Sequence, residues 1–159
     1  RSGADLSEAL QVMHETVRRL GNPDFYVSAL VARWRPATRT LTWVNCGHPP
    51  AYLAHTDASL IELESPEHAA LGVGDDERTF SLAQRELHSG ERLILVTDGI
   101  TGRRTEGGGT FGADGIKQAL AGIENQTACS TAMAVLQGVT DCWREPLEDD
   151  GTVAVLAID

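Results

Sequence analysis

Basic residues are scarce in this chain: 13 Lys and Arg stand against 23 Asp and Glu, for a formal net charge of −10 over 159 residues. A protein whose main partner is nucleic acid needs basic clusters that neutralise phosphates, and the sequence contains no such run. The charge therefore argues against nucleic acid as the main partner. It is compatible with a site that binds cations.

Cysteine and long apolar runs are scarce too. The 3 cysteines, Cys46, Cys129 and Cys142, include no C-x-x-C pair, which argues against a disulfide framework and suits a reducing compartment. No apolar stretch approaches the ~18 residues of a membrane-spanning helix, and no signal peptide is recognisable. We therefore expect a cytoplasmic protein without a membrane span. Because the chain begins with Arg1 rather than Met, we expect it to be a piece of a longer protein.

Common catalytic motifs are absent as well. His14 begins an H-E-x-x-H pattern, but Arg18 stands where the second His would be, so no zinc protease site is expected. The glycine run at 107–109 lacks the Lys and Ser/Thr of a phosphate-binding loop, and the G-x-S-x-G nucleophile elbow does not occur. Catalysis, if present, must use other chemistry.

The pattern of apolar residues predicts one α+β domain with an antiparallel sheet. Hydrophobic residues make up 42% of the chain and charged residues 23%, as in globular proteins. A helix is predicted over 6–20, ended by Gly21 and Pro23. Strands are predicted over 25–34, 41–46, 51–54, 60–63, 77–87, 93–97 and 152–158, and further helices over 111–123 and 132–143. Strands and helices that come in runs, rather than in strict alternation, indicate α+β.

Two acidic signals adjoin short buried-strand patterns far apart in the chain. Asp98-Gly99 follows the apolar run 93–96, and Asp149-Asp150 precedes the run 153–158. Carboxylates held at strand ends are hard oxygen ligands that can converge on one Mg²⁺ or Mn²⁺, and Gly99 would let the backbone approach the ion. The alternatives are that Asp98 only caps the next turn and that Asp149-Asp150 is a solvated turn.

A histidine between glycine and proline marks the end of the strand over 41–46. The segment reads Asn45-Cys46-Gly47-His48-Pro49-Pro50. As a general base, His48 would need an acid partner that the sequence does not identify. We favour a structural turn in which Pro49 keeps His48 extended and the imidazole hydrogen-bonds nearby backbone.

Several segments occur in an order and spacing shared with one known family: residues 6–20, Phe25–Leu30, Asn45–Pro50, Leu71–Val73, Gly90–Ile100, Phe111–Gly112 and Asp149–Val153. In these motifs the chain resembles the SpoIIE/RsbU branch of the metal-dependent PPM serine/threonine protein phosphatases. The resemblance implies a four-layer α-β-β-α sandwich with antiparallel sheets.

Two departures from the family pattern qualify that fold. The family domain opens with strands that carry Gly-Asp-x-Tyr-Asp-like and Gly-His-Gly motifs, and neither occurs here. Residues 1–159 are therefore expected to be the C-terminal two-thirds of such a domain, without its first strands and without the Asp that bridges two metal ions. Position 102 is Gly, where the family often has Glu.

The resemblance also implies a reaction and a site. Phosphoserine or phosphothreonine would be hydrolysed by water activated between two Mn²⁺ or Mg²⁺ ions, without a phosphoenzyme. Asp98 and Asp149 would be metal ligands next to Gly99, and Asp150 a neighbour that acts through water. The implied substrate is a phosphorylated regulatory protein such as an anti-sigma factor antagonist.

Alternatives to a complete enzyme stay open. The first is a non-catalytic PPM-like regulatory or protein-binding module, and a weaker one is a structural metal-binding domain. The isolated chain is expected to be inactive or weakly active, since it lacks the bridging carboxylate. Sheet edges left open by the missing strands favour pairing with another chain, for example as a homodimer.

Overall fold

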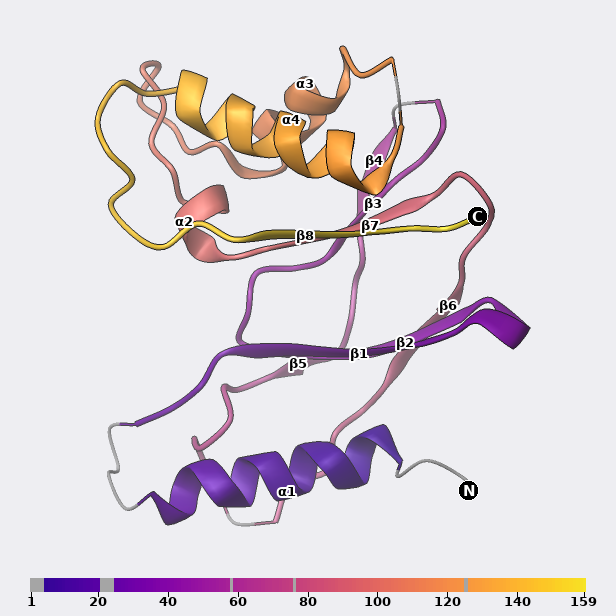
Figure 1. Ribbon diagram of the computed structural model, residues 1–159. Helices are drawn as coiled ribbons and strands as arrows, with labels where there is room; N and C mark the ends of the chain where they lie inside the picture. Colours follow the sequence, from indigo (N-terminus) through magenta and orange to yellow (C-terminus); the bar gives the residue numbers. More distant parts are fainter. Residues whose placement is uncertain (1–4, 21–24, 58, 76, 125) are drawn as a thin grey trace. The chain divides into compact units, whose positions relative to one another are not determined.

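The computed structural model describes residues 5–20, 25–57, 59–75, 77–124 and 126–159. The chain divides into two compact units, each with its own sheet and helices (Figure 1). Unit 1 comprises residues 1–48 and 64–87, and unit 2 comprises residues 49–63 and 88–159.

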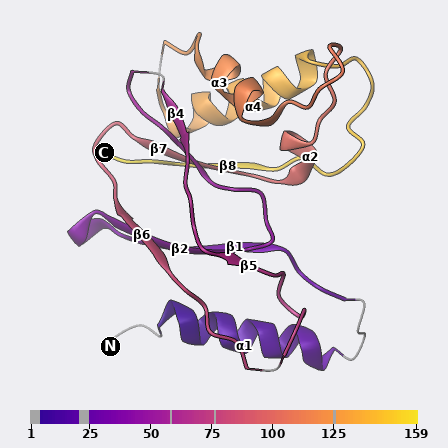
Figure 2. The same cartoon turned by 180° about the vertical axis from the view of Figure 1, so that it is seen from behind.

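Unit 1 packs helix α1 (Leu6–Arg19) against a small sheet (Figure 2). Asp5 caps the helix, since its side chain accepts a hydrogen bond from the Ser7 amide. Strand β2 (Thr40–Cys46) lies between β1 (Ala29–Arg35) and β6 (Ala83–Glu86), antiparallel to both. The core is formed by Leu6, Leu10, Val44, Cys46, Leu71 and Phe80.

The sequence predictions for unit 1 need three corrections. The first strand begins at Ala29 rather than residue 25, and only Val27 of the preceding segment forms a bridge, with Leu71. The strand predicted over 77–87 shrinks to 83–86. A two-residue strand, β5 (Glu67–His68), was missed and pairs parallel to β2, so the sheet is not purely antiparallel.

Local contacts explain part of these differences. The Arg78 side chain donates to the carbonyls of Ala69, Ala70 and Val73, which holds its own segment against a loop. An alternating pattern cannot reveal such a side-chain-to-backbone anchor. The predicted helix stop at Gly21 and Pro23 lies outside the described residues, and within them the helix ends with Leu20 as its C-cap.

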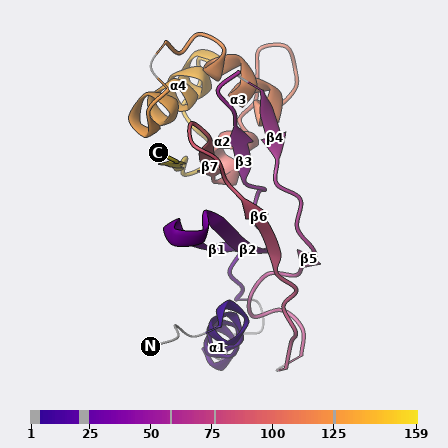
Figure 3. The same cartoon turned by 90° about the vertical axis from the view of Figure 1, so that its right-hand side faces the viewer.

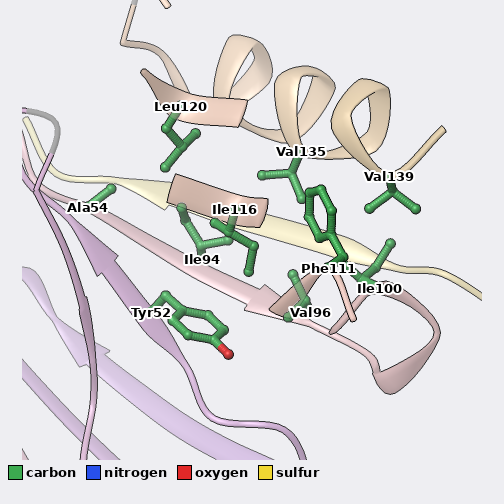
Figure 4. Packing of buried hydrophobic residues seen from close by; sticks show 10 residues of the cluster. All are labelled: Tyr52, Ala54, Ile94, Val96, Ile100, Phe111, Ile116, Leu120, Val135 and Val139. Carbon is green, nitrogen blue, oxygen red and sulfur yellow. The ribbon is translucent and has the colours of Figure 1, made fainter. Parts of the chain in front are cut away.

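Unit 2 has an antiparallel sheet of order β4-β3-β7-β8, with β3 at Tyr52–Ala54, β4 at Leu60–Glu62, β7 at Arg92–Val96 and β8 at Val153–Ala157. Helices α3 (Gly112–Leu120) and α4 (Ala128–Asp141) cover one face of this sheet (Figure 3). Their apolar faces meet β3 and β7 in one core, which also contains Ile100 and Phe111 (Figure 4).

Two features of unit 2 differ from the sequence predictions. Asp98–Thr101 forms a short helix, α2, where only a strand end and a loop were expected. Helix α4 begins at Ala128 rather than residue 132, because Thr127 and Ser130 form a capping box that the apolar periodicity did not reveal. Strands β7 and β8 lie where the apolar runs predicted them.

The predicted α+β class is confirmed as two sheets with flanking helices. The four-layer stacking of these elements stays a prediction. Among the described residues, no helix has the length and apolar character needed to cross a membrane.

Candidate metal centre

The acidic segments at Asp98 and at Asp149–Asp150 meet where β7 ends and β8 begins. Val96 pairs with Val153 as the last residue pair of the two strands. Just beyond it, the Thr97 amide donates to the Thr152 carbonyl (3.1 Å). The Thr97 hydroxyl donates to the Asp150 carbonyl (3.0 Å) and accepts from the Thr152 amide (2.8 Å). One threonine therefore ties the two acidic loops together.

Asp98 is the first residue of α2, and its side chain is exposed. Its Oδ1 accepts from the Gly99 amide at 3.0 Å, so one carboxylate oxygen supports the helical turn. Ile100, fully buried beside Phe111 and Val139, anchors this turn to the core (Figure 4). The alternative that Asp98 only stabilises the next turn therefore accounts for one of its carboxylate oxygens. The side chain is nevertheless exposed to solvent, on a turn that Ile100 fixes to the core.

Gly99 is required by the opposite loop. A Cβ built at this buried position would lie 2.5 Å from the Asp150 carbonyl oxygen and 3.1 Å from that of Asp149. Any side chain would push the two loops apart. The structure thus gives a reason for glycine that the sequence did not suggest, the packing of the Asp149–Asp150 backbone. Approach of the Gly99 backbone to an ion stays a prediction.

Asp149 and Asp150 lie in the loop before β8, and both are exposed. The Asp149 Oδ1 accepts from the Asp150 amide at 2.8 Å, and the Asp150 carbonyl is held by Thr97. Both residues precede the strand, which starts only at Val153.

The carboxylates of Asp98 and Asp149 are the right type of ligand for a hard divalent cation, but two of them are fewer than a complete protein ligand set. Exposed carboxylates are the ligands that Mg²⁺ prefers, and Mg²⁺ commonly uses one or two of them and keeps several waters. In the parts of the chain that the structure describes, no group of three or more His, Cys, Asp or Glu side chains could hold an ion. That Asp98 and Asp149 are metal ligands, and that they share one ion, stays a prediction.

Sequence reasoning missed Arg103, which is almost fully buried just after α2. Its guanidinium donates to the carbonyls of Pro146 (2.7 Å) and Trp143 (2.9 Å) and to that of Glu145. These residues lie shortly before Asp149. Within a charged, glycine-rich stretch, nothing in the sequence marks this arginine as buried.

His48 belongs to unit 1, and its turn is fixed chiefly through a neighbour. The Asn45 side chain accepts from the His48 amide (2.9 Å) and donates to the His48 carbonyl (2.8 Å). Gly47 supports the turn with φ +70°, a conformation that favours glycine. The structural role of this turn is confirmed for its backbone, while a role for the imidazole stays a prediction.

The class of this fold follows from a solved relative: two sheets with flanking helices match the fold of the SpoIIE phosphatase domain. The chain matches the family model described as "Stage II sporulation protein E (SpoIIE)" over residues 1–159. It belongs to this family, as a SpoIIE-type PPM phosphatase domain.

Individual relatives agree with the family assignment. The chain is 24% identical over 160 residues to phosphoserine phosphatase RsbU of Bacillus subtilis (strain 168), an alignment that covers 98% of this chain and 46% of RsbU. It thus spans about half the length of that relative.

Solved structures show the same fold. A structure of the PP2C phosphatase domain with a regulatory fragment of SpoIIE from Bacillus subtilis matches with a TM-score of 0.84 at 18% identity, over 99% of this chain and 46% of that one. RsbX in complex with magnesium matches with a TM-score of 0.68 at 13% identity, over 97% of this chain and 65% of that one.

Proposed function

We propose that this domain hydrolyses phosphoserine or phosphothreonine in a protein, with Asp98 and Asp149 as ligands of Mg²⁺ or Mn²⁺. The observation that carries the proposal is the Thr97 bridge, which ties the loop of Asp98 to that of Asp149. Family membership supplies the reaction class, and the RsbX structure is of a magnesium complex. When bound, such ions would activate water and neutralise charge on the phosphate.

The chain's own residues would hold and orient this centre. Asp98 would present its carboxylate from a turn anchored by Ile100, and Asp149 from a loop held against Gly99. Asp150 would be a neighbour of the ion that acts through water, and its backbone carbonyl accepts from Thr97. A third carboxylate, the bridging Asp of the family, would come from residues outside 1–159. In this proposal, residues 1–159 form the C-terminal two-thirds of the domain.

The proposed substrate is a phosphorylated regulatory protein such as an anti-sigma factor antagonist. The support is the likeness to RsbU of Bacillus subtilis, a phosphoserine phosphatase. The net charge of −10 makes a nucleic acid an unsuitable partner. A cytoplasmic location and pairing as a homodimer are part of the same proposal.

A non-catalytic, protein-binding module is the second candidate. The observation that favours it is the lack, among the described residues, of a cluster with three metal-ligating side chains. Such a module would bind its partner without metal.

Hydrolysis of a phosphoserine peptide by the complete protein, with and without Mn²⁺, separates the two candidates. The enzyme proposal expects metal-dependent phosphate release that is lost on EDTA treatment and much weaker in the 159-residue chain. Absence of release from the complete protein at any Mn²⁺ concentration, with partner binding intact, would favour the module.

A further inference from the structure

We propose that Arg103 is a positioning residue for the metal centre. In this view its buried guanidinium fixes the segment 143–146 and thereby sets where Asp149 lies relative to Asp98. The inference rests on the proposed function, because it concerns the same centre. Neither the acidic motifs nor the resemblance assigns a role to this arginine.

The buried side chain of Arg103 cross-links its own segment to the segment 143–146. Arg103 is 6% exposed, and its two terminal nitrogens reach three carbonyl oxygens, those of Trp143, Glu145 and Pro146. Its Nε is buried without a hydrogen-bond partner, and no carboxylate among the described residues forms an ion pair with it. A buried cation that meets only carbonyl dipoles acts as a cross-link between chain segments.

The backbone of Arg103 joins it to the end of helix α2. Its amide donates to the Ile100 carbonyl (3.3 Å) at the end of α2, and its carbonyl accepts from the Phe111 amide (2.7 Å). The helix that begins with Asp98 is therefore joined rigidly to the arginine, while the side chain holds the strand-preceding loop. Arg103 thus connects the helix that carries Asp98 with the loop that carries Asp149, without contacting either carboxylate.

Stability alone is a weak reason for this arrangement. Burial of a guanidinium is costly, and apolar replacements of similar volume are often neutral or stabilising. Glu145 and Pro146 are exposed, so water can reach this segment if the arginine is removed. The planar fork of Arg can hold several carbonyls in a fixed geometry, which Lys cannot reproduce. The arrangement favours precise placement of the loop.

The test compares Arg103→Met, Arg103→Lys and the control Arg104→Gln in the complete protein. Arg104 is exposed and, among the described residues, forms an ion pair with exposed Glu148 at 3.7 Å, so the control removes the same charge from the same loop. For Arg103→Met we expect the Mn²⁺ concentration for half-maximal hydrolysis to rise by ~10–100-fold, the usual effect of losing a residue that orients a metal ligand. The value of kcat at saturating Mn²⁺ should stay within about twofold, Lys should restore part of the affinity, and the control should behave as wild type.

Hydrogen exchange in the metal-free protein provides a readout that does not depend on activity. Arg103→Met should speed exchange at the Asp150 and Thr152 amides and leave the β3 amides unchanged. If Arg103→Met does not fold, the same comparison with Arg103→Lys decides.

Unchanged Mn²⁺ affinity and exchange, or a fall in kcat alone, would overturn the positioning role. If only the positioning role is wrong, Asp98→Asn still weakens Mn²⁺ binding. If the proposed metal site itself is wrong, Asp98→Asn leaves Mn²⁺ binding unchanged as well.

Discussion

Thr97 and Thr152 are joined by two hydrogen bonds, one between their backbones and one to the Thr97 hydroxyl. The Thr97 amide donates to the Thr152 carbonyl at 3.1 Å, and the Thr97 hydroxyl accepts from the Thr152 amide at 2.8 Å. The same hydroxyl donates to the Asp150 carbonyl at 3.0 Å. The backbone pairing of β7 and β8 is thus continued by a side chain one residue beyond the strands, where the acidic loops begin.

Replacement of Thr97 by Val should therefore loosen both loops. Val keeps the shape and loses the hydroxyl, so the Thr152 amide and the Asp150 carbonyl lose their partner. We expect the free energy of unfolding to fall by about 1–3 kcal/mol and Mn²⁺ affinity to weaken. Thr97→Ser, which keeps the hydroxyl, is the matched control. Urea unfolding measures the first effect, and equal stability of the Val and Ser variants would contradict the bridging role.

Gly99→Ala should separate the loops directly. Its Cβ would lie 2.5 Å from the Asp150 carbonyl oxygen, so the backbone must shift, at a cost of about 1–3 kcal/mol for overpacking. Gly107→Ala is the control, because a Cβ there meets nothing within 4 Å. Thermal unfolding and Mn²⁺ titration compare the two variants. A Gly99→Ala protein that matches Gly107→Ala in both would show that the close approach is unimportant.

In unit 1, Asn45→Ala should destabilise the turn at His48. Both hydrogen bonds from the Asn45 side chain to the His48 backbone are lost, and we expect a cost of about 1–3 kcal/mol. His48→Ala should cost no more than this and should lower kcat only modestly well below the melting point. Loss of ~10²–10⁴ in kcat with stability intact would instead identify His48 as a general acid or base.

Cys46 should be unreactive in the folded protein and should make stability depend on alkaline pH. It is fully buried, and burial raises the pKa of its thiol above the ordinary 9.0, while nearby Arg78 partly opposes this. The folded state then favours the neutral thiol, so its contribution to stability is present below pH 9.0 and is lost as pH rises through the folded pKa. Cys46→Ala should remove that part of the alkaline slope. Alkylation by iodoacetamide should label exposed Cys129 first, and equal labelling of Cys46 would contradict its burial.

The sequence was sufficient to predict the helices and strands with strong apolar patterns and the acidic residues that adjoin them. Strands β7 and β8 were predictable because their apolar runs are continuous, and the acidic residues adjoin those runs. Helix α2 and the start of α4 were not, because a four-residue helix has no period and the Thr127–Ser130 box lies outside the apolar stripe.

The residues that hold the two acidic loops together were less predictable than the acidic residues themselves. Thr97 and Arg103 hold backbone atoms of residues that are distant in the sequence, so residue types alone do not reveal them. The acidic residues could be found because their chemistry limits what they can bind, whereas a hydroxyl or guanidinium that holds carbonyls can occur almost anywhere.

The central claim is that Asp98 and Asp149 bind one divalent cation between them. Calorimetric titration of the complete protein with Mn²⁺ tests it most directly, with Asp98→Asn, Asp149→Asn and, as a control for charge in the same loop, Glu148→Gln. We expect each aspartate substitution to weaken the same binding event strongly, the double variant to lose little more than either single one, and Glu148→Gln to bind as wild type. Mn²⁺ binding that is unchanged in both aspartate variants would contradict the account.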